Sequence, residues 1–259
     1  MEDLVLLDIG EHVATLTLNR PEAMNSFNVA MVRALGERLA ELRFDKRVRV
    51  VIVTGSGAKA FSAGADLKER AGMTPEQVKE FIFNIRRLMD DVEQFPRPVI
   101  AAVNGVALGG GTELALAADI RLAADTATMG LTETRLAIIP GAGGTQRLPR
   151  LVGKGIAKEM IFTGCRVTAQ EALRNGLVNY VHPPAELMTA ARRLADEICQ
   201  SGPIAVEQAK YAINRGLETD LQTGLAIESN AYWLCIPTED RLEGLTAFRE
   251  KRKPVYKGK

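Results

Sequence analysis

Two glutamates occupy glycine-rich segments in which paired acids could do acid-base chemistry. Glu113 lies in NGVALGGGTELALAAD (104–119), and Glu133 lies twenty positions later in MGLTETRLAIIPGAGG (129–144). Each acid also has an ordinary structural interpretation. A glutamate in the first turn of a helix, such as Glu113, interacts favourably with the helix dipole, and an acid such as Glu133 can cap a helix. If both carboxylates face one spot, one can be held protonated while the other is ionised. Glu113 and Glu133 are therefore candidates for an acid and a base.

Two loops of small residues are candidates for binding a developing negative charge. Gly109 to Gly111 precede a run of helix formers, and a helix start leaves unpaired N–H groups. The loop FSAGADLK (61–68) also permits close backbone approach. If one of its N–H groups and that of Gly110 met at one oxygen, they would form an oxyanion hole, each donor being worth about 3 to 4 kcal/mol. A tight strand-to-helix connection accounts for the three glycines equally well.

Composition excludes several classes of protein. Lys and Arg total 33 against 32 for Asp and Glu, so the formal charge of +1 provides no field to attract a polyanion. Hydrophobic residues make up 46% of the 259 positions, which excludes disordered and collagen-like chains. We expect no signal segment and no membrane span, since the amino terminus lacks a basic region and no apolar run reaches about 18 residues.

Cysteine and histidine usage argues against metal and disulfide sites. The three cysteines (Cys165, Cys199, Cys235) are odd in number and far apart, which fits reduced thiols in the cytoplasm. With only His12 and His182 available, we expect no metal site.

The spacing of apolar residues predicts the elements that must position these groups. The apolar run at 4–8 and the alternating pattern at 13–19 predict an antiparallel strand pair turning at Gly10, and 29–43 should form an amphipathic helix. Apolar runs at 50–53, 99–103 and 136–139 are typical of buried strands, and each precedes a glycine-containing loop. The order of strand, loop and helix predicts an α/β fold built from similar units.

The chain changes character near its carboxyl end. From about residue 185 the pattern is helical only, and we expect a core with the active site over 1–195 and a helical region over 196–259. The apolar and aromatic residues of this region either contact another subunit or pack on the core.

Five segments resemble the enoyl-CoA hydratase (crotonase) family. They are AFSAGADLKE (60–69), PVIAAVNGVALGGGTELALAADIRLA (98–123), MGLTETRLAIIPGAGGTQRLPRLVGK (129–154), LNRPEAMNS (18–26) and FTGCRVTAQEALRNGLVNYV (162–181). The similarity covers practically the whole chain in order. It implies a spiral of ββα units with a carboxyl-terminal helical trimerisation region, commonly stacked as a dimer of trimers.

The resemblance also implies roles for single residues. The N–H groups of Ala65 and Gly110 would hold the oxygen of a thioester carbonyl. Glu113 would deprotonate a water molecule, and Glu133 would give a proton to the α-carbon of a 2-enoyl thioester. The implied substrate is an acyl-CoA whose adenine borders the loop Ala63, Gly64, Ala65, Asp66 and Leu67, and no separate cofactor is implied.

The reaction is expected to be the reversible hydration of 2-trans-enoyl-CoA to 3-hydroxyacyl-CoA, with fatty-acid β-oxidation as the default setting. Relatives that only shift the double bond generally keep one acid, so two glutamates favour hydration. Double-bond isomerisation and methylglutaconyl-CoA hydration are the alternatives, the second because GADLKERAGM and MGLTETRLAIIPG also resemble that branch.

Three further segments keep an ordinary and a functional interpretation. The apolar stripe within 70–95 (Met73, Val78, Phe81, Ile82, Ile85, Leu88, Met89) suits core packing better than an acyl pocket. The basic residues between Arg33 and Arg49 alternate with acids and lack aromatic partners, so we expect a solvated face rather than an RNA site. The basic tail KRKPVYKGK (251–259) suits a mobile end better than a contact to coenzyme A phosphates.

Overall fold

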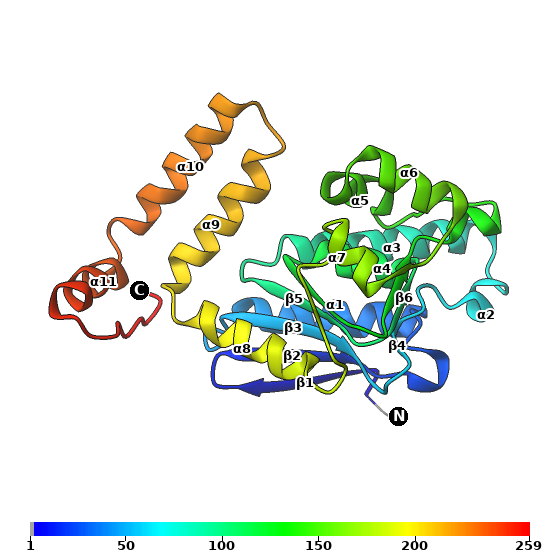
Figure 1. The fold of residues 1–259 in the computed structure, drawn as a ribbon, viewed down its shortest axis with the longest axis horizontal. Helices are drawn as coiled ribbons and strands as arrows, with labels where there is room; N and C mark the ends of the chain where they lie inside the picture. Colours follow the sequence, from blue (N-terminus) through cyan, green and yellow to red (C-terminus); the bar gives the residue numbers. More distant parts are fainter. Residues whose placement is uncertain (1–2) are drawn as a thin grey trace.

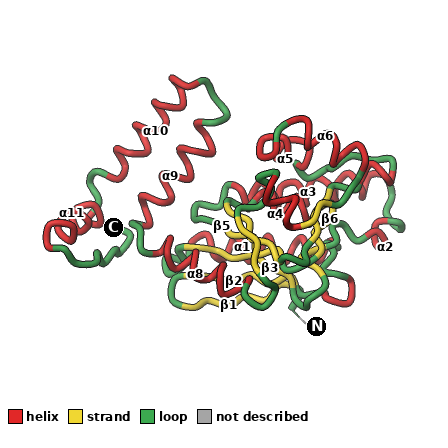
Figure 2. The backbone as a smooth tube through the Cα atoms, viewed as in Figure 1, coloured by secondary structure: helices red, strands yellow, loops and turns green. Residues whose placement is uncertain are grey.

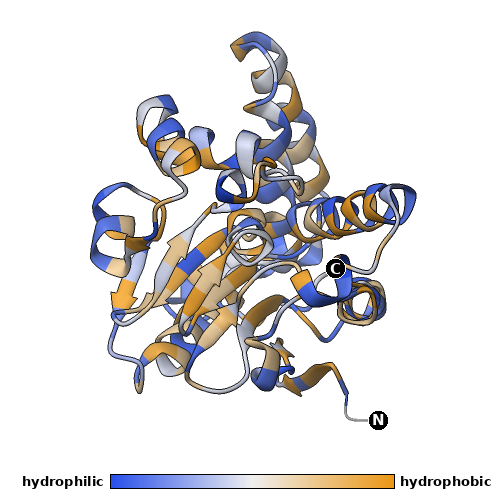
Figure 3. Ribbon diagram, turned by 90° about the vertical axis from the view of Figure 1, so that its right-hand side faces the viewer, coloured by the Kyte–Doolittle hydropathy of each residue, from blue (hydrophilic) through white to orange (hydrophobic). Residues whose placement is uncertain are grey.

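A six-stranded sheet forms the centre of the computed structural model, which describes residues 3–259 (Figure 1). Its strands, in spatial order, are β1 (Val5–Gly10), β2 (Val13–Leu18), β3 (Val50–Gly55), β5 (Val99–Val103), β7 (Ile120–Ala124) and β10 (Tyr180–His182). The pair β1 and β2 is antiparallel, as the sequence predicts, and every other neighbour pair is parallel. All residues of β3 and β5 are buried, because helices cover both faces of the sheet. Figure 3 shows hydrophobic residues along these central strands.

A second sheet carries the loops of the candidate site. It contains β4 (Ala60–Ser62), β6 (Val106–Leu108), β8 (Thr128–Gly130) and β9 (Val167–Thr168), in that order. Each of β4 and β6 comes shortly after a strand of the large sheet, so the chain passes from one sheet to the other before each loop of the site.

Helices cover the large sheet on its two faces (Figures 1 and 2). On one face α1 (Val29–Phe44) contacts β1 and β2 and packs against α3 (Pro75–Glu93), and on the other face α8 (Leu187–Cys199) contacts β3, β5 and β7. Asn28 caps α1, and Thr74 and Gln77 form a capping box at the start of α3. Two basic side chains of α1 pair with acids one turn along the helix, Arg33 with Glu37 at 2.8 Å and Arg38 with Glu41 at 3.0 Å, which agrees with a solvated face.

The remaining core helices surround the second sheet. They are η1 (Pro21–Ala23), α2 (Leu67–Arg70), α4 (Gly110–Ala117), η2 (Glu133–Leu136), α5 (Gly144–Val152), α6 (Lys154–Thr163) and α7 (Ala169–Arg174). The helix α4 is buried along its whole length, so its first turn lies inside the molecule rather than at the surface.

The strand predicted at 136–139 is wrong. Glu133–Leu136 is a 3₁₀ helix, Ala137 has a left-handed φ of 56°, and Ile139 is 68% exposed. Four apolar residues in a row are compatible with a strand, but here Pro140 follows directly and the run lies on the surface. The strands of this region are instead β7 and β8.

The carboxyl-terminal helices form an arm. They are α9 (Pro203–Gly216), α10 (Leu221–Cys235) and α11 (Glu239–Glu250), and α9 and α10 form an antiparallel hairpin beside the core (Figure 1). Partly buried ion pairs attach α9 to the core: Lys210 pairs with Asp119 at 2.7 Å, and Arg97 pairs with Glu207 at 3.3 Å. The expected boundary between residues 195 and 196 lies inside α8, so the arm follows that helix.

The basic tail is fixed rather than mobile. The carboxylate of Asp240 accepts hydrogen bonds from the amides of Lys257 (2.7 Å) and Gly258 (2.8 Å), and Arg49 donates to the carbonyl of Tyr256 at 2.7 Å. The prediction of a mobile end is wrong because Asp240 supplies acceptors that composition alone does not reveal.

Candidate active site

Glu113 lies in the first turn of α4, and the residue is only 3% exposed to solvent. Its Oε1 atom accepts hydrogen bonds from the backbone amides of Ala142 and Gly144, both at 2.8 Å. These amides belong to the loop that starts α5. Burial raises the pKa of Glu113, while the amides of Gly144 and Ala142 and the charge of Arg147 oppose that rise.

Glu133 begins η2 and faces the same region with different partners. Its Oε2 atom is buried and receives no hydrogen bond within residues 3–259. Burial and the nearby charge of Glu113 raise the pKa of Glu133 to about 7, against the opposing effects of its own backbone amide and of Arg70. The carboxyl group lies against Gly109, where an added Cβ would be 3.1 Å from Oε1.

The two carboxyl groups form an electrostatically coupled pair with unequal surroundings. Glu113 accepts two backbone hydrogen bonds from the start of α5, whereas the ionised form of Glu133 is stabilised only by its own backbone amide and by the charge of Arg70. These donors favour the ionised form of Glu113 more than that of Glu133. Burial raises the pKa of both carboxyl groups, and Glu113 raises that of Glu133 further.

Two unused amides lie in adjoining loops. Neither the N–H of Ala65 nor that of Gly110 donates to an acceptor within residues 3–259. The loops touch, since a Cβ added to Gly64 would lie 3.0 Å from the nitrogen of Gly110. Gly64 also has a φ of +86°, a conformation that glycine adopts without strain.

The segment LNRPEAMNS holds the first of these loops in place. The side-chain amide of Asn25 donates to the carbonyl of Ala60 at 2.8 Å and to that of Ser56 at 3.0 Å. Arg20 donates to the carboxylate of Asp66 at 3.0 Å, and Phe27 forms an isolated parallel bridge with Ala65. A motif distant in sequence thus fixes the backbone around Ala65.

The other expected coenzyme A contacts surround Ala65 but differ in their availability. The amide of Ala63 donates to the carbonyl of Met24, and that of Gly64 donates to the Ser62 hydroxyl. Asp66 caps α2 as well as pairing with Arg20, so its carboxylate is occupied. Leu67 is exposed, which leaves an apolar side chain beside the loop.

The stripe within 70–95 is core packing with two exceptions. Most of its residues belong to the hydrophobic core, as expected. Ile85 also reaches the site, because its Cδ1 atom would be 3.2 Å from a Cβ at Gly110. Ile82 would be 3.0 Å from a Cβ at Gly141, so these two isoleucines border the loops that carry the amides.

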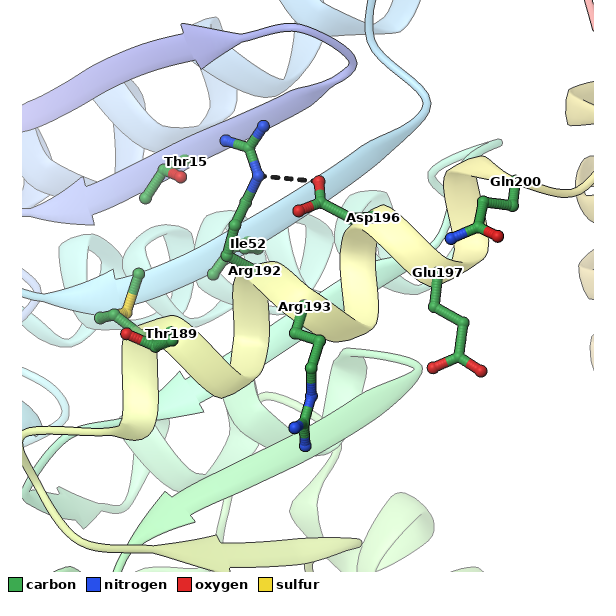
Figure 4. A pocket seen from close by; sticks show the side chains of 9 residues that line it. Thr15, Ile52, Thr189, Arg192, Arg193, Asp196, Glu197 and Gln200 are labelled. Atoms are coloured by element: carbon green, nitrogen blue, oxygen red, sulfur yellow. Dashed lines mark hydrogen bonds and ion pairs between the residues drawn. The ribbon is translucent and has the colours of Figure 1, made fainter. Parts of the chain in front are cut away.

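A groove of about 800 Å³ lies elsewhere, between α8 and the strands β2 and β3 (Figure 4). Its lining includes Arg192, paired with Asp196 at 2.9 Å, and none of the residues discussed above. In the part of the chain from residue 3 onward, no cluster of three His, Cys, Asp or Glu side chains could hold a metal ion. No helix over the same residues is long and apolar enough to cross a membrane.

Sequence reasoning missed the amides of Ala142 and Gly144 and the arginine behind them. The available signal was the loop GAGG followed three residues later by Arg147, which is a glycine-rich helix start with a cation one turn along.

Fold and site together define an α/β enzyme in which two buried carboxyl groups lie near free backbone amides. The family model for enoyl-CoA hydratase/isomerase matches residues 8–259, and the chain belongs to this family.

The chain is 58% identical to YngF of Bacillus subtilis over the whole length of both proteins, and the name of YngF assigns it to the enoyl-CoA hydratase/isomerases. It is 49% identical to human mitochondrial methylglutaconyl-CoA hydratase, covering 95% of this chain and 74% of that protein. The crystal structure of an enoyl-CoA hydratase from Bacillus anthracis superposes with a TM-score of 0.98 at 55% identity, covering 99% of this chain and 100% of that one. The expected crotonase-type α/β fold is thereby confirmed.

Proposed function

We propose that this protein catalyses the reversible hydration of 2-trans-enoyl-CoA to 3-hydroxyacyl-CoA. The observation that carries the proposal is the asymmetry of the acid pair. Glu113 accepts two amide hydrogen bonds through one oxygen, whereas Glu133 has a buried oxygen without a partner and a pKa raised to about 7 by burial and by Glu113. Addition of water to a conjugated double bond requires one group that takes a proton and one that gives a proton.

Each group has one role in the proposed reaction. The amides of Ala65 and Gly110 hold the thioester oxygen, on which negative charge develops when water adds to the β-carbon. Glu113 takes one proton from that water as the carbon–oxygen bond forms. Glu133 gives its proton to the α-carbon, so the pair holds one proton before and after the reaction. The reverse steps remove water, and no group beyond the coenzyme A thioester is needed.

The loop of Ala63, Gly64, Ala65, Asp66 and Leu67 is proposed to border the adenine of coenzyme A. Two observations support this. Asn25 holds β4 before the loop and Arg20 holds Asp66 within it, and the side chain of Leu67 is exposed beside it. A fixed loop can hold the thioester oxygen at constant distance from the two amides.

The direct test is the loss of the conjugated thioester absorbance of crotonyl-CoA with purified protein. Glu113→Gln and Glu133→Gln should each lower kcat by about 10² to 10⁴ while the circular dichroism spectrum stays unchanged. Glu159→Gln, on the exposed face of α6, is the matched control and should keep full activity. Absence of turnover by the wild-type protein would reject the proposal for this substrate, and full activity of either site variant would reject the two-acid mechanism.

A second candidate is hydration of an acyl group with its own carboxylate, such as methylglutaconyl-CoA. The similarity to the human methylglutaconyl-CoA hydratase supports it. So does Arg70, whose charge acts on Glu133 and whose side chain forms no ion pair within residues 3–259. Comparison of kcat/KM for crotonyl-CoA and 3-methylglutaconyl-CoA separates the two candidates. Arg70→Met should lower kcat/KM much more for the acid-bearing substrate than for crotonyl-CoA, for which it acts only through Glu133. Isomerisation is distinguished by product mass, because only hydration adds the mass of water.

Association into trimers or hexamers is proposed from the arm. Its exposed side chains include Tyr232 (66%), Trp233 (63%) and Phe248 (87%), which is unusual for aromatic residues in a monomer. Light scattering after size-exclusion chromatography should give a trimer or hexamer mass, and a monomer mass would reject this proposal.

A further inference from the structure

Arg147 is a buried cation behind the loop that holds Glu113. It lies one turn into α5, and its side chain is 10% exposed. One guanidinium nitrogen, Nη1, donates to the carbonyl of Ala142 at 3.0 Å. The other, Nη2, donates to Asp90 at 2.7 Å and to Glu93 at 2.8 Å, both on α3.

The loop residue Ala142 is consequently held at both of its backbone groups. Its carbonyl accepts from Arg147, and its amide donates to Oε1 of Glu113 at 2.8 Å. Gly143 lies over the guanidinium with a φ of +105°, where a Cβ would collide with Nη1. Only glycine allows this close approach, so the loop and the arginine fit each other.

We propose that Arg147, fixed by Asp90 and Glu93, is the positioning residue that aligns the amides of Ala142 and Gly144 with the base Glu113. The inference rests on the proposed hydration, in which Glu113 takes the proton from water. Arg147 contacts none of the reacting atoms and positions Glu113 through the loop that contains Ala142. A small displacement of the base reduces the rate strongly, because proton transfer requires hydrogen-bond distance.

The charge of Arg147 gives the experiment a second readout. The charge of Arg147 on α5 acts on Glu113, and Glu113 in turn acts on Glu133 of η2; Asp90 and Glu93 of α3 lie behind the arginine. Arg147 opposes the rise in the pKa of Glu113, so its removal raises that pKa further. The acid limb of the pH–rate profile, where Glu113 becomes protonated, then moves to higher pH.

The test compares Arg147→Met, Arg147→Lys and the control Arg150→Met with the wild-type protein on crotonyl-CoA. Arg150 lies on the same helix and pairs with Glu218 in solvent, so its variant should match the wild type. Arg147→Met should lower kcat by at least about tenfold with little change in KM, and its acid limb should shift upward. Arg147→Lys keeps the charge but cannot reach the carbonyl and both carboxylates at once, so it should restore the limb without restoring kcat.

The outcomes separate the two proposals. A wild-type protein that does not hydrate crotonyl-CoA contradicts the proposed function for that substrate. An active wild type with unchanged kcat and acid limb in Arg147→Met contradicts the positioning role, as does full recovery by Arg147→Lys. A lower rate that matches only a lower folded fraction, with the limb unmoved, also overturns it. If Arg147→Met does not fold, the lysine variant alone decides by the same comparison of kcat and limb.

Discussion

The amide of Gly144 donates a 2.8 Å hydrogen bond to Oε1 of Glu113, and a Cβ added to that glycine would lie 3.0 Å from the same oxygen. It would also lie 2.8 Å from Cδ1 of Leu131 and 2.9 Å from Cβ of Pro140. The glycine is therefore required by space around the carboxylate, and the start of α5 is part of the site.

Replacement of Gly144 should lower activity by more than any change in the stability of the helix accounts for. Gly144→Ala must displace the carboxylate of Glu113 or its backbone donor, and we expect kcat to fall at least about tenfold. Gly155→Ala on α6 is the matched control, because nothing lies within 4 Å of its added Cβ. That control should keep its activity and gain up to about 1 kcal/mol in the free energy of unfolding. Equal activity of the two variants would contradict the steric argument.

The pH dependence should follow the protonation of the coupled pair. Both directions of the reaction need one proton on the pair, so kcat/KM should fall above about pH 7, where Glu133, its pKa raised to about 7 by burial and by Glu113, loses that proton. It should fall again in acid when Glu113 is protonated. Initial rates of hydration and of dehydration should give the same bell-shaped profile, since their ratio is the equilibrium constant. A profile flat from pH 6 to 9 would contradict the assignment.

Glu133 should cost the folded state free energy at neutral pH. Burial and Glu113 raise its pKa from 4.5 to about 7, so the folded protein binds the proton more tightly than the unfolded chain between those values. The free energy of unfolding contributed by this group therefore falls as pH rises through that window and is constant above it. Glu133→Gln should be more stable than the wild type by about 1 to 3 kcal/mol at pH 8, with little difference at pH 4. Urea unfolding at both values measures this, and a difference independent of pH would be the contrary result.

Lys210 and Asp119 should anchor the arm more strongly than a surface pair does. The Lys210 side chain is 8% exposed, and burial raises the pKa of Asp119 against the effect of that lysine. Lys210→Met removes the cation that contacts the partly buried carboxylate of Asp119 and leaves only the charge of Arg121 to act on it, so it should cost about 1 to 3 kcal/mol in unfolding free energy.

The control for the anchor is Arg150→Met, because Arg150 and Glu218 also connect the core with the arm but are 55% and 57% exposed. Their loss should cost no more than about 1 kcal/mol. Denaturant unfolding followed by the fluorescence of Trp233 on α10 reports on the arm directly. Similar losses for both variants would show that burial does not strengthen the anchor.

Local sequence predicted the elements whose pattern is strong. Observed elements correspond to the strand signals at 4–8 and 13–19, to the buried runs at 50–53 and 99–103 and to the helix at 29–43. The strand predicted at 136–139 is wrong because a short apolar segment looks the same in the sequence whether it forms a buried strand or lies on the surface. The prediction of a mobile tail is wrong because Asp240 holds residues 257 and 258 by hydrogen bonds, which the composition of the tail does not reveal.

By itself the sequence determined the α/β class, the family resemblance and the two glutamates, because these follow from residue types and their order along the chain. Tertiary structure alone decided that Ala142 and Gly144 hold Glu113, that Glu133 keeps an oxygen without a partner, and that Arg147 stands behind the loop. The physical reason is that burial, hydrogen bonding and charge at a carboxyl group are set by segments distant in sequence. The difference in proton affinity between two identical side chains therefore arises only when the chain folds.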